Sequence, residues 1–119
     1  MPERMPENGV KVWYRVRDLA AARLFYVDLL GFEETYHDAE GCWARLRNGS
    51  MEIGLTEGAP EEGGVAVIDA ADVKAEAERL RASGVEVGTV LELHGKIRLL
   101  DVFDPDGNRI QLVESLAGS

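Results

Sequence analysis

The feature that most constrains this chain is a pattern that occurs twice: an acidic residue, a helical segment, a glycine and a strand, at nearly the same spacing. The first copy begins at Asp18 (DLAAARLFYVDLLGFEE) and the second at Asp72 (DVKAEAERLRASGVEV). Aspartate is a favoured N-cap, and a glycine after the last turn ends many helices in a left-handed conformation. The two copies share few identical residues. The pattern therefore indicates either a repeat of architecture or two unrelated strand–helix units in an α+β fold.

Strand signals surround both helical segments. Residues 10–17 alternate between two sets, which is strand periodicity: Val12, Tyr14 and Val16 against Lys11, Trp13 and Arg15. Further strands are predicted over 32–37, 42–47 and 50–56, with Asn48-Gly49 as a type I′ hairpin turn. The second cycle predicts strands over 64–69, 85–93, 96–103 and 109–114, with a proline turn over 104–107.

The resulting order is strand, helix and three strands, repeated once. In the first helix one face carries the apolar residues Leu19, Ala22, Tyr26, Leu29 and Leu30; the second helix has Val73, Ala77 and Leu80. A chain of 119 residues has room for one core, so we expect a single domain over 1–119. Module one covers about 10–56, a linker covers 57–63, and module two covers about 64–114.

Composition limits the partners. Acidic residues outnumber basic residues 22 to 13 and the formal charge is −9, which argues against nucleic acid and against an anionic membrane surface. No apolar run is long enough to span a membrane, and the polar N-terminus does not look like a signal peptide, so a cytoplasmic location is expected. The single cysteine, Cys42, cannot form an internal disulfide and is expected to be a buried structural thiol.

Three segments resemble the vicinal-oxygen-chelate superfamily of glyoxalases, bleomycin-resistance proteins and extradiol dioxygenases. They are VRDLAAARLFYVDLLGFEE (16–34), ADVKAEAERLRASGVEV (71–87) and DVFDPDGNRIQLVE (101–114), and their order along the chain extends the resemblance over nearly all of it. The resemblance implies two βαβββ modules whose mixed sheets curl into a cup, with the helices outside and the ligand within. It also implies a homodimer, in which a cup can draw residues from two chains. One scaffold of this kind hosts many activities.

Metal-dependent members of that superfamily take four ligands from the first and fourth strands of each module. The corresponding positions here are Lys11, Glu52, Val65 (Gly64 if the register slips by one) and Gln111. Val65 has no donor atom and Lys11 carries a protonated amine, so we expect no metal and no other cofactor, with a divalent ion disfavoured. Lys11 could instead reach Glu52 and place an ammonium at the metal position, or both side chains could be exposed at a sheet edge.

The histidines and the remaining strand positions complete the expected cup. His37 and His94 are predicted to face solvent instead of a metal. Because side chains alternate along a strand, placing Lys11 inside the cup also places its alternate neighbours there. Leu100 is expected in the cup beside Arg98. The predicted ligand-binding residues are Lys11, Trp13, Arg15, Trp43, Arg45, Glu52, Arg98 and Gln111.

Tryptophan walls suit a flat or aromatic molecule, and arginines suit carboxylates or phosphates, so an anionic or polar aromatic ligand is expected. The tryptophans could equally fill the core, and the arginines could pair with surface acids. Three functions stay open. The first is a metal-independent small-molecule-binding protein of the drug-sequestering kind. The second is an enzyme, either a metal-dependent lyase, isomerase or dioxygenase or a metal-free one with Glu52 as general base. The third is a module with an inert cup.

Overall fold

The computed structural model describes residues 10–59 and 64–116 and contains the predicted pair of βαβββ modules. Module one consists of β1 (Val12–Val16), α1 (Leu19–Leu24) continued by the π-helical turn η1 (Phe25–Leu29), β2 (Glu33–Asp38), β3 (Trp43–Asn48) and β4 (Met51–Glu57). Module two consists of β5 (Ala66–Asp69), α2 (Val73–Ala82), β6 (Glu86–Val87), β7 (Leu91–Leu93), β8 (Ile97–Phe103) and β9 (Arg109–Ser115). The predicted strand over 85–93 is thus divided into β6 and β7.

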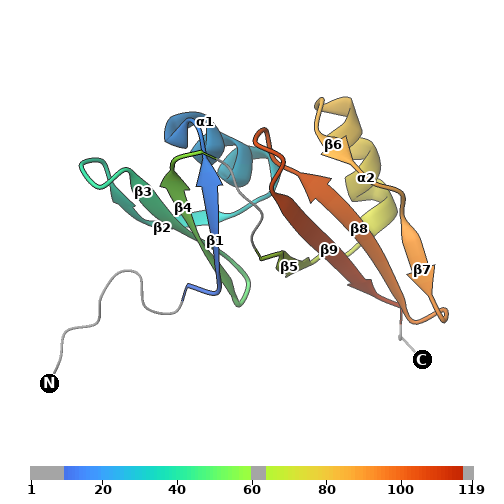
Figure 1. Ribbon diagram of the computed structural model, residues 1–119. Helices are drawn as coiled ribbons and strands as arrows, with labels where there is room; N and C mark the ends of the chain where they lie inside the picture. Colours follow the sequence, from blue (N-terminus) through green and yellow to red (C-terminus); the bar gives the residue numbers. More distant parts are fainter. Residues whose placement is uncertain (1–9, 60–63, 117–119) are drawn as a thin grey trace, which may run out of the picture.

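Each module folds into its own mixed sheet. The first sheet has the order β1-β4-β3-β2, in which β1 and β4 are parallel. The second has the order β5-β9-β8-β6, with β7 also paired to β8, and β5 and β9 are parallel. The two sheets lie side by side with β1 and β5 in the middle, and both helices cover the same face of the layer (Figure 1). The other face is called the open face below. The predicted α+β class is confirmed.

The helix ends follow the sequence signals. The side chain of Asp18 accepts a hydrogen bond from the Ala21 backbone N–H, and Asp72 does the same for Ala75. Gly31 has a φ of +74°, and the Phe32 N–H bonds the Tyr26 carbonyl at 2.9 Å; at the second helix the bonds from Val85 to Leu80 and from Gly84 to Arg81 form a Schellman motif. No helix in the described part of the chain is long and apolar enough to cross a membrane.

One turn differs from the prediction. The hairpin between β3 and β4 pairs Asn48 with Met51, so its loop is Gly49-Ser50 and not Asn48-Gly49. Gly49 alone has a positive φ, +59°, which is the pattern of a type II′ turn. The type I′ turn occurs instead between β7 and β8, where His94 and Gly95 both have positive φ and the Lys96 N–H bonds the Leu93 carbonyl. The backbone twist of both turn types matches the right-handed twist of the strands that they connect.

A single core lies between the strand layer and the two helices. In module one an alternate set of side chains from three strands enters it: Tyr14 and Val16 of β1, Ala44 and Leu46 of β3, and Ile53 and Leu55 of β4. The same is true of module two, where Leu100, Val102, Ile110 and Leu112 are buried beneath α2. Because side chains alternate across a strand, the other set faces the open side of the layer.

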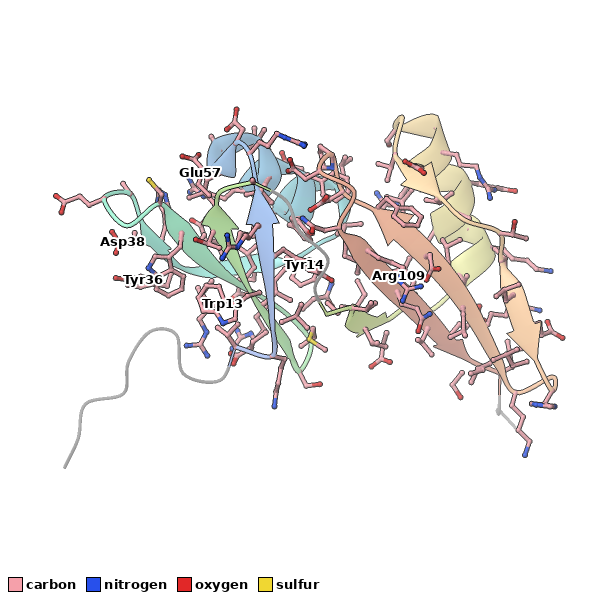
Figure 2. The ribbon with its side chains drawn as sticks, in the orientation of Figure 1. Trp13, Tyr14, Tyr36, Asp38, Glu57 and Arg109 are labelled. Carbon is pink, nitrogen blue, oxygen red and sulfur yellow. The ribbon has the colours of Figure 1, made fainter. Side chains whose placement is uncertain are left out.

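The two modules are joined by side-chain hydrogen bonds. The buried Tyr14 hydroxyl accepts from the Ala66 N–H at 2.7 Å and donates to the Arg109 carbonyl at 2.5 Å, and Figure 2 shows Tyr14 between the two sheets. Burial raises the pKa of this hydroxyl to about 12. The Tyr26 hydroxyl donates to the buried Asp104 carboxylate, and burial raises the pKa of this phenol too. The two tyrosines therefore tie module one to β5, β9 and the turn before β9.

The turn Asp104-Pro105-Asp106-Gly107 forms as predicted, with the Gly107 N–H bonded to the Asp104 carbonyl at 2.9 Å. The Asp104 carboxylate also receives the backbone N–H groups of Asp106 and Asn108. The side-chain N–H of Asn108 then donates to the Arg15 carbonyl at 2.9 Å, on the edge of β1 that faces module two. This motif consequently docks module two on β1, and its role in the structure is architectural.

Candidate functional site

Most of the predicted site residues lie together on the open face of the first sheet, in three rows that cross the strands. In the strand register, Arg15, Thr56, Trp43 and Asp38 form one row, Trp13, Gly54, Arg45 and Tyr36 form the next, and Lys11, Glu52, Arg47 and Glu33 form the third. Six predicted residues are therefore brought together: Lys11, Trp13, Arg15, Trp43, Arg45 and Glu52.

Three aromatic rings form the centre of this face. The Trp13 and Trp43 ring centroids are 5.3 Å apart, and those of Tyr36 and Trp43 are 5.0 Å apart. Trp13 is 42% exposed and Tyr36 is 39% exposed. Figure 2 shows Trp13 and Tyr36 gathered at the same part of the first sheet. The alternative that the tryptophans fill the core is therefore wrong. Trp13, Tyr36 and Trp43 are called the aromatic platform below.

Gly54 allows Trp13 to take this position. A Cβ atom at Gly54 would lie 2.4 Å from two carbon atoms of the Trp13 ring, which is far inside van der Waals contact. The ring thus rests on the backbone of β4, at a place where no other residue type leaves room. The sequence alone does not reveal this contact, although it places Gly54 and Trp13 on the same face.

The sequence did not predict Tyr36 as a site residue, because the pairing of β2 is irregular. The register pairs Glu34 with the core residue Leu46 but Tyr36 with the open-face residue Arg45, so the pairing shifts between them. A bulge of this kind turns every later side chain to the opposite face. Uninterrupted alternation from the buried Phe32 would place Tyr36 on the core side. Nothing in the sequence of this strand marks the shift.

Glu52 forms an ion pair beside the platform. Its Oε2 accepts from the Arg45 guanidinium at 2.6 Å, and the two side chains are only 20% and 11% exposed. Lys11 and Glu52 are neighbours on the same face, since the Lys11 N–H bonds the Glu52 carbonyl at 2.7 Å. Within the described residues, however, the Lys11 side chain makes no ion pair with Glu52. The hypothesis that Lys11 supplies the cation for Glu52 is wrong, because Arg45 does so.

The second sheet contributes a different set to the open face. Gln111 lies there, with its side-chain amide 3.3 Å from Asp101 Oδ1. Val67 is its register partner on β5, and Asp101 is its partner on β8. Asp101 also accepts a longer bond from Arg109 at 3.4 Å. Sequence reasoning missed Asp101 because it assigned the opposite alternation to this strand.

Arg98 and Leu100 are not on the open face. Leu100 is completely buried in the core beneath α2, and Arg98 has the same parity along β8. Arg98 pairs with Glu92 at 3.0 Å and with Glu114 at 3.7 Å, and Glu114 in turn accepts the first N–H of α2. The predicted inward orientation of these two residues is therefore wrong by one position of the strand register.

The side chains that replace them on the open face are aliphatic. Leu91 is 54% exposed and Leu93 is 41% exposed, and the register places both beside half-buried residues of β8 and β9. We call this group the aliphatic strip: Leu91, Leu93, Ile97, Leu99 and Val113.

The four positions that correspond to metal ligands do not fit a divalent ion. Val65 has no donor atom, Lys11 has an ammonium group, and the Glu52 carboxylate already receives Arg45. Gln111 is the remaining donor. Within residues 10–59 and 64–116 no group of three or more His, Cys, Asp or Glu side chains is placed to hold a metal. His37 and His94 are exposed, as predicted. Cys42 is half-buried, so the prediction of a buried thiol is wrong in degree.

Comparisons with known proteins agree with this architecture. The family model described as Glyoxalase/Bleomycin resistance protein/Dioxygenase superfamily matches residues 10–112. No curated protein matches the chain. Among solved structures, the fosfomycin resistance protein FosX from Listeria monocytogenes is similar with a TM-score of 0.74 and 20% identity, covering 98% of this chain and 97% of that chain.

Two further solved structures have other activities in their names. The lactoylglutathione lyase from Agrobacterium tumefaciens has a TM-score of 0.71 and 21% identity, with 96% of this chain and 95% of that chain covered. The bleomycin resistance determinant of transposon Tn5 has a TM-score of 0.68 and 16% identity, with 87% and 94% covered. At these identities the likeness establishes the fold and leaves the activity to be argued from the site.

Proposed function

Because the chain belongs to the Glyoxalase/Bleomycin resistance protein/Dioxygenase superfamily, we propose that it binds a flat, polar or anionic aromatic molecule on its aromatic platform, without a metal ion. The observation that carries this proposal is the exposure of Trp13 and Tyr36 around Trp43 on one sheet face. Large aromatic side chains are normally buried, and a contiguous exposed group of them marks a surface that binds something. Rings of this kind stack on flat ligands.

The charges next to the platform favour an anionic or polar substituent on the ligand. Lys11 and Arg15 flank Trp13 on the same strand and face, and both are exposed. Arg45 lies between Tyr36 and Gly54 in the row of the platform, and it is compensated by Glu52. The ion pair gives a ligand one donor and one acceptor group at fixed positions. A phenolate or carboxylate would then be held by Lys11, with the positive charge of Arg15 on the same face.

Metal independence is part of the proposal and rests on donor chemistry. Two of the four equivalent positions, Lys11 and Val65, offer no ligand atom for a metal, and the carboxylate at a third, Glu52, is already paired with Arg45. Bringing Glu52 to a metal would require Arg45 to lose its ion-pair partner while remaining mostly covered. For the same reason we assign Glu52 a structural role at the platform and not the role of a general base.

A second copy of the chain is the partner that we propose for the aliphatic strip. Superfamily members commonly form dimers, and the strand registers place both the strip and the platform on the open face. The open face of module one carries the cations Lys11 and Arg15, whereas that of module two carries Asp69 and Asp101. A two-fold arrangement would place unlike charges opposite each other and would cover the aliphatic strip. Light scattering after gel filtration would then give a mass of two chains.

The test uses three compounds that share one ring system: 2-naphthoate, naphthalene-2-methanol and 2-naphthylmethylamine. Each is titrated into tag-free protein in a buffer with a metal chelator, and tryptophan fluorescence and calorimetry report binding. We expect saturable binding of 2-naphthoate, with an affinity for the neutral alcohol weaker by about fivefold, the value of one well-placed charge interaction.

Two variants locate the binding. Trp13→Val should weaken 2-naphthoate binding by at least about tenfold, since it removes the ring that rests on Gly54. The matched control is Trp43→Phe, which keeps an aromatic ring on the platform and should lose less affinity. Unchanged affinity in Trp13→Val, or binding that requires an added divalent metal, would overturn the proposal.

A further inference from the structure

A threonine next to the aromatic platform has a hydroxyl group that is not engaged by the rest of the described chain. Thr56 pairs with Trp43 of β3 and with Arg15 of β1, and its side chain is half-buried on the open face. Among residues 10–59 and 64–116 this hydroxyl makes no hydrogen bond. A hydroxyl group can donate one hydrogen bond and accept two. Thr56 therefore offers hydrogen-bonding capacity to a molecule on the platform.

The strand pairing brings the Thr56 side chain close to the Trp43 ring. The Glu57 N–H bonds the Cys42 carbonyl at 2.9 Å, so these two residues form a hydrogen-bonded pair of the antiparallel ladder. The next pair, Trp43 and Thr56, is then of the other kind, in which facing side chains lie closer together. A flat ligand that covers the Trp43 ring consequently reaches the Thr56 hydroxyl.

The charges on one side of the platform direct an anionic group away from Thr56. In the row that begins with Lys11, Glu52 is paired with Arg45, and Arg47 is paired with Glu33. These pairs compensate each other, so the exposed Lys11 ammonium is the excess charge on this side of the platform. An anionic group of a ligand is favoured there.

The opposite side of the platform has no excess charge. The row that contains Thr56 has one cation, Arg15, and one anion, Asp38, which lies beyond Trp43 on β2 (Figure 2). Between these two charges the row presents the Thr56 hydroxyl, which suits a neutral polar group. The platform thus has two chemically different sides, one for an anionic group and one for a neutral hydrogen-bonding group.

We propose that Thr56 determines the specificity of the platform, by selecting aromatic anions that carry a hydroxyl or carbonyl group at the end opposite to the anionic group. This inference rests on the proposed function. The rings lie on Trp13 and Trp43, the anionic group lies at Lys11, and the neutral group bonds the Thr56 hydroxyl. Lys11 and Arg15 are about 13 Å apart along β1 at the usual rise per residue. Two fused rings with a substituent at each end, together with the flexible Lys11 side chain, bridge that span.

The test compares two compounds that differ only at the neutral end, 6-hydroxy-2-naphthoate and 6-methyl-2-naphthoate. Calorimetry at pH 7 with a metal chelator measures both affinities. Because a hydroxyl and a methyl group are similar in size, the ratio of the two affinities reports the hydrogen bond. We expect the hydroxy compound to bind about twofold to tenfold more tightly, which corresponds to the net contribution of one hydrogen bond between neutral groups.

Four variants assign this ratio to a residue. Thr56→Val replaces the hydroxyl with a methyl group and should make the two affinities nearly equal, whereas Thr56→Ser keeps the hydroxyl and should keep the ratio. Lys11→Gln should weaken both compounds by about twofold to fivefold at an unchanged ratio, because Lys11 holds the carboxylate that they share. The matched control is Thr89→Val, which makes the same substitution at an exposed threonine of module two and should change neither affinity.

The assignment is overturned if the hydroxy compound binds no more tightly than the methyl compound, or if Thr56→Val leaves their ratio unchanged. It is also overturned if Lys11→Gln abolishes the ratio, because the hydroxyl would then lie at Lys11. Each of these results leaves binding of 2-naphthoate to the platform intact. If no naphthoate binds, or if Trp13→Val leaves the affinities unchanged, the proposed function itself fails, and the two failures are thereby distinguished.

Discussion

The two modules have the same chain order and nearly the same core, but their open faces carry different residues. In module one Trp13 rests on Gly54 of the neighbouring parallel strand. The corresponding place in module two holds Val67, paired with Gln111. Both modules cap their helix with an aspartate and run their first strand parallel to their last. The module therefore depends on the core side of each strand, and its open face is free to vary.

This difference explains why the fold and the function are separable in the chain. Residues on the core side are fixed by packing between the strands and the helices, where a change of one methylene group is felt. Residues on the open side contact solvent or a ligand and carry no such constraint. As a result, the open face of module one carries aromatic rings and cations, and the open face of module two carries aliphatic residues with Asp101 and Gln111.

The largest expected effect tests whether the two modules contribute equally to the stability of the single core. Leu46 of β3 and Leu100 of β8 are both completely buried. Leu46→Ala and Leu100→Ala should each lower the free energy of unfolding by about 2–5 kcal/mol, through lost burial and the cavity left behind. Urea denaturation measures both, and the two losses should be similar. A loss several times larger in one variant would mean that one module holds most of the core stability.

The next effect tests the junction between the modules. Tyr14→Phe removes the hydroxyl that bonds the Ala66 N–H and the Arg109 carbonyl, leaving two backbone groups without that partner. We expect a loss of roughly 2–4 kcal/mol in the free energy of unfolding, since an unsatisfied buried polar group costs about 1–3 kcal/mol. Thermal and urea unfolding check this, and a variant as stable as the original chain would show that the modules do not need this contact.

The same hydroxyl makes the junction sensitive to high pH. The pKa of Tyr14 is raised from 10.0 to about 12 in the folded chain, so folding favours the neutral phenol. Its contribution is therefore complete below pH 10 and is lost as the pH rises from 10 through 12. The stability difference between the original chain and Tyr14→Phe should shrink over that interval. A difference that stays constant up to pH 12 contradicts this assignment.

Much of the fold could be predicted from the sequence, because its signals are local. Asp18, Asp72, Gly31 and Gly84 mark helix ends by capping chemistry, and the alternation in β1 separates Tyr14 from Trp13. These patterns depend on residues close in the chain. They do not need knowledge of what the strands pack against.

The wrong predictions concern strands in which a shift of one residue in the register moves a side chain to the opposite face. The shift in β2 before Tyr36 hid one platform residue, and a register wrong by one in β8 exchanged Arg98 for Asp101. Glu52 has two cations nearby, Arg45 and Lys11, and the sequence does not show which of them forms the ion pair. Contacts of this kind are fixed by register and by tertiary packing, which local patterns do not encode.

The smallest expected effects compare the ion pairs on the two open faces. Arg45 and Glu52 are 2.6 Å apart with side chains 11% and 20% exposed, whereas Arg109 and Asp101 are 3.4 Å apart with side chains 50% and 32% exposed. Glu52→Gln removes the negative charge that faces the mostly covered Arg45 guanidinium and should cost about 1–3 kcal/mol of unfolding free energy. Asp101→Asn should cost less than about 0.5 kcal/mol, because water and salt screen exposed pairs. Urea denaturation at low and high salt measures both. Equal losses would mean that the platform pair is as solvated as the other one, and then Glu52 and Arg45 would offer a ligand no fixed donor and acceptor.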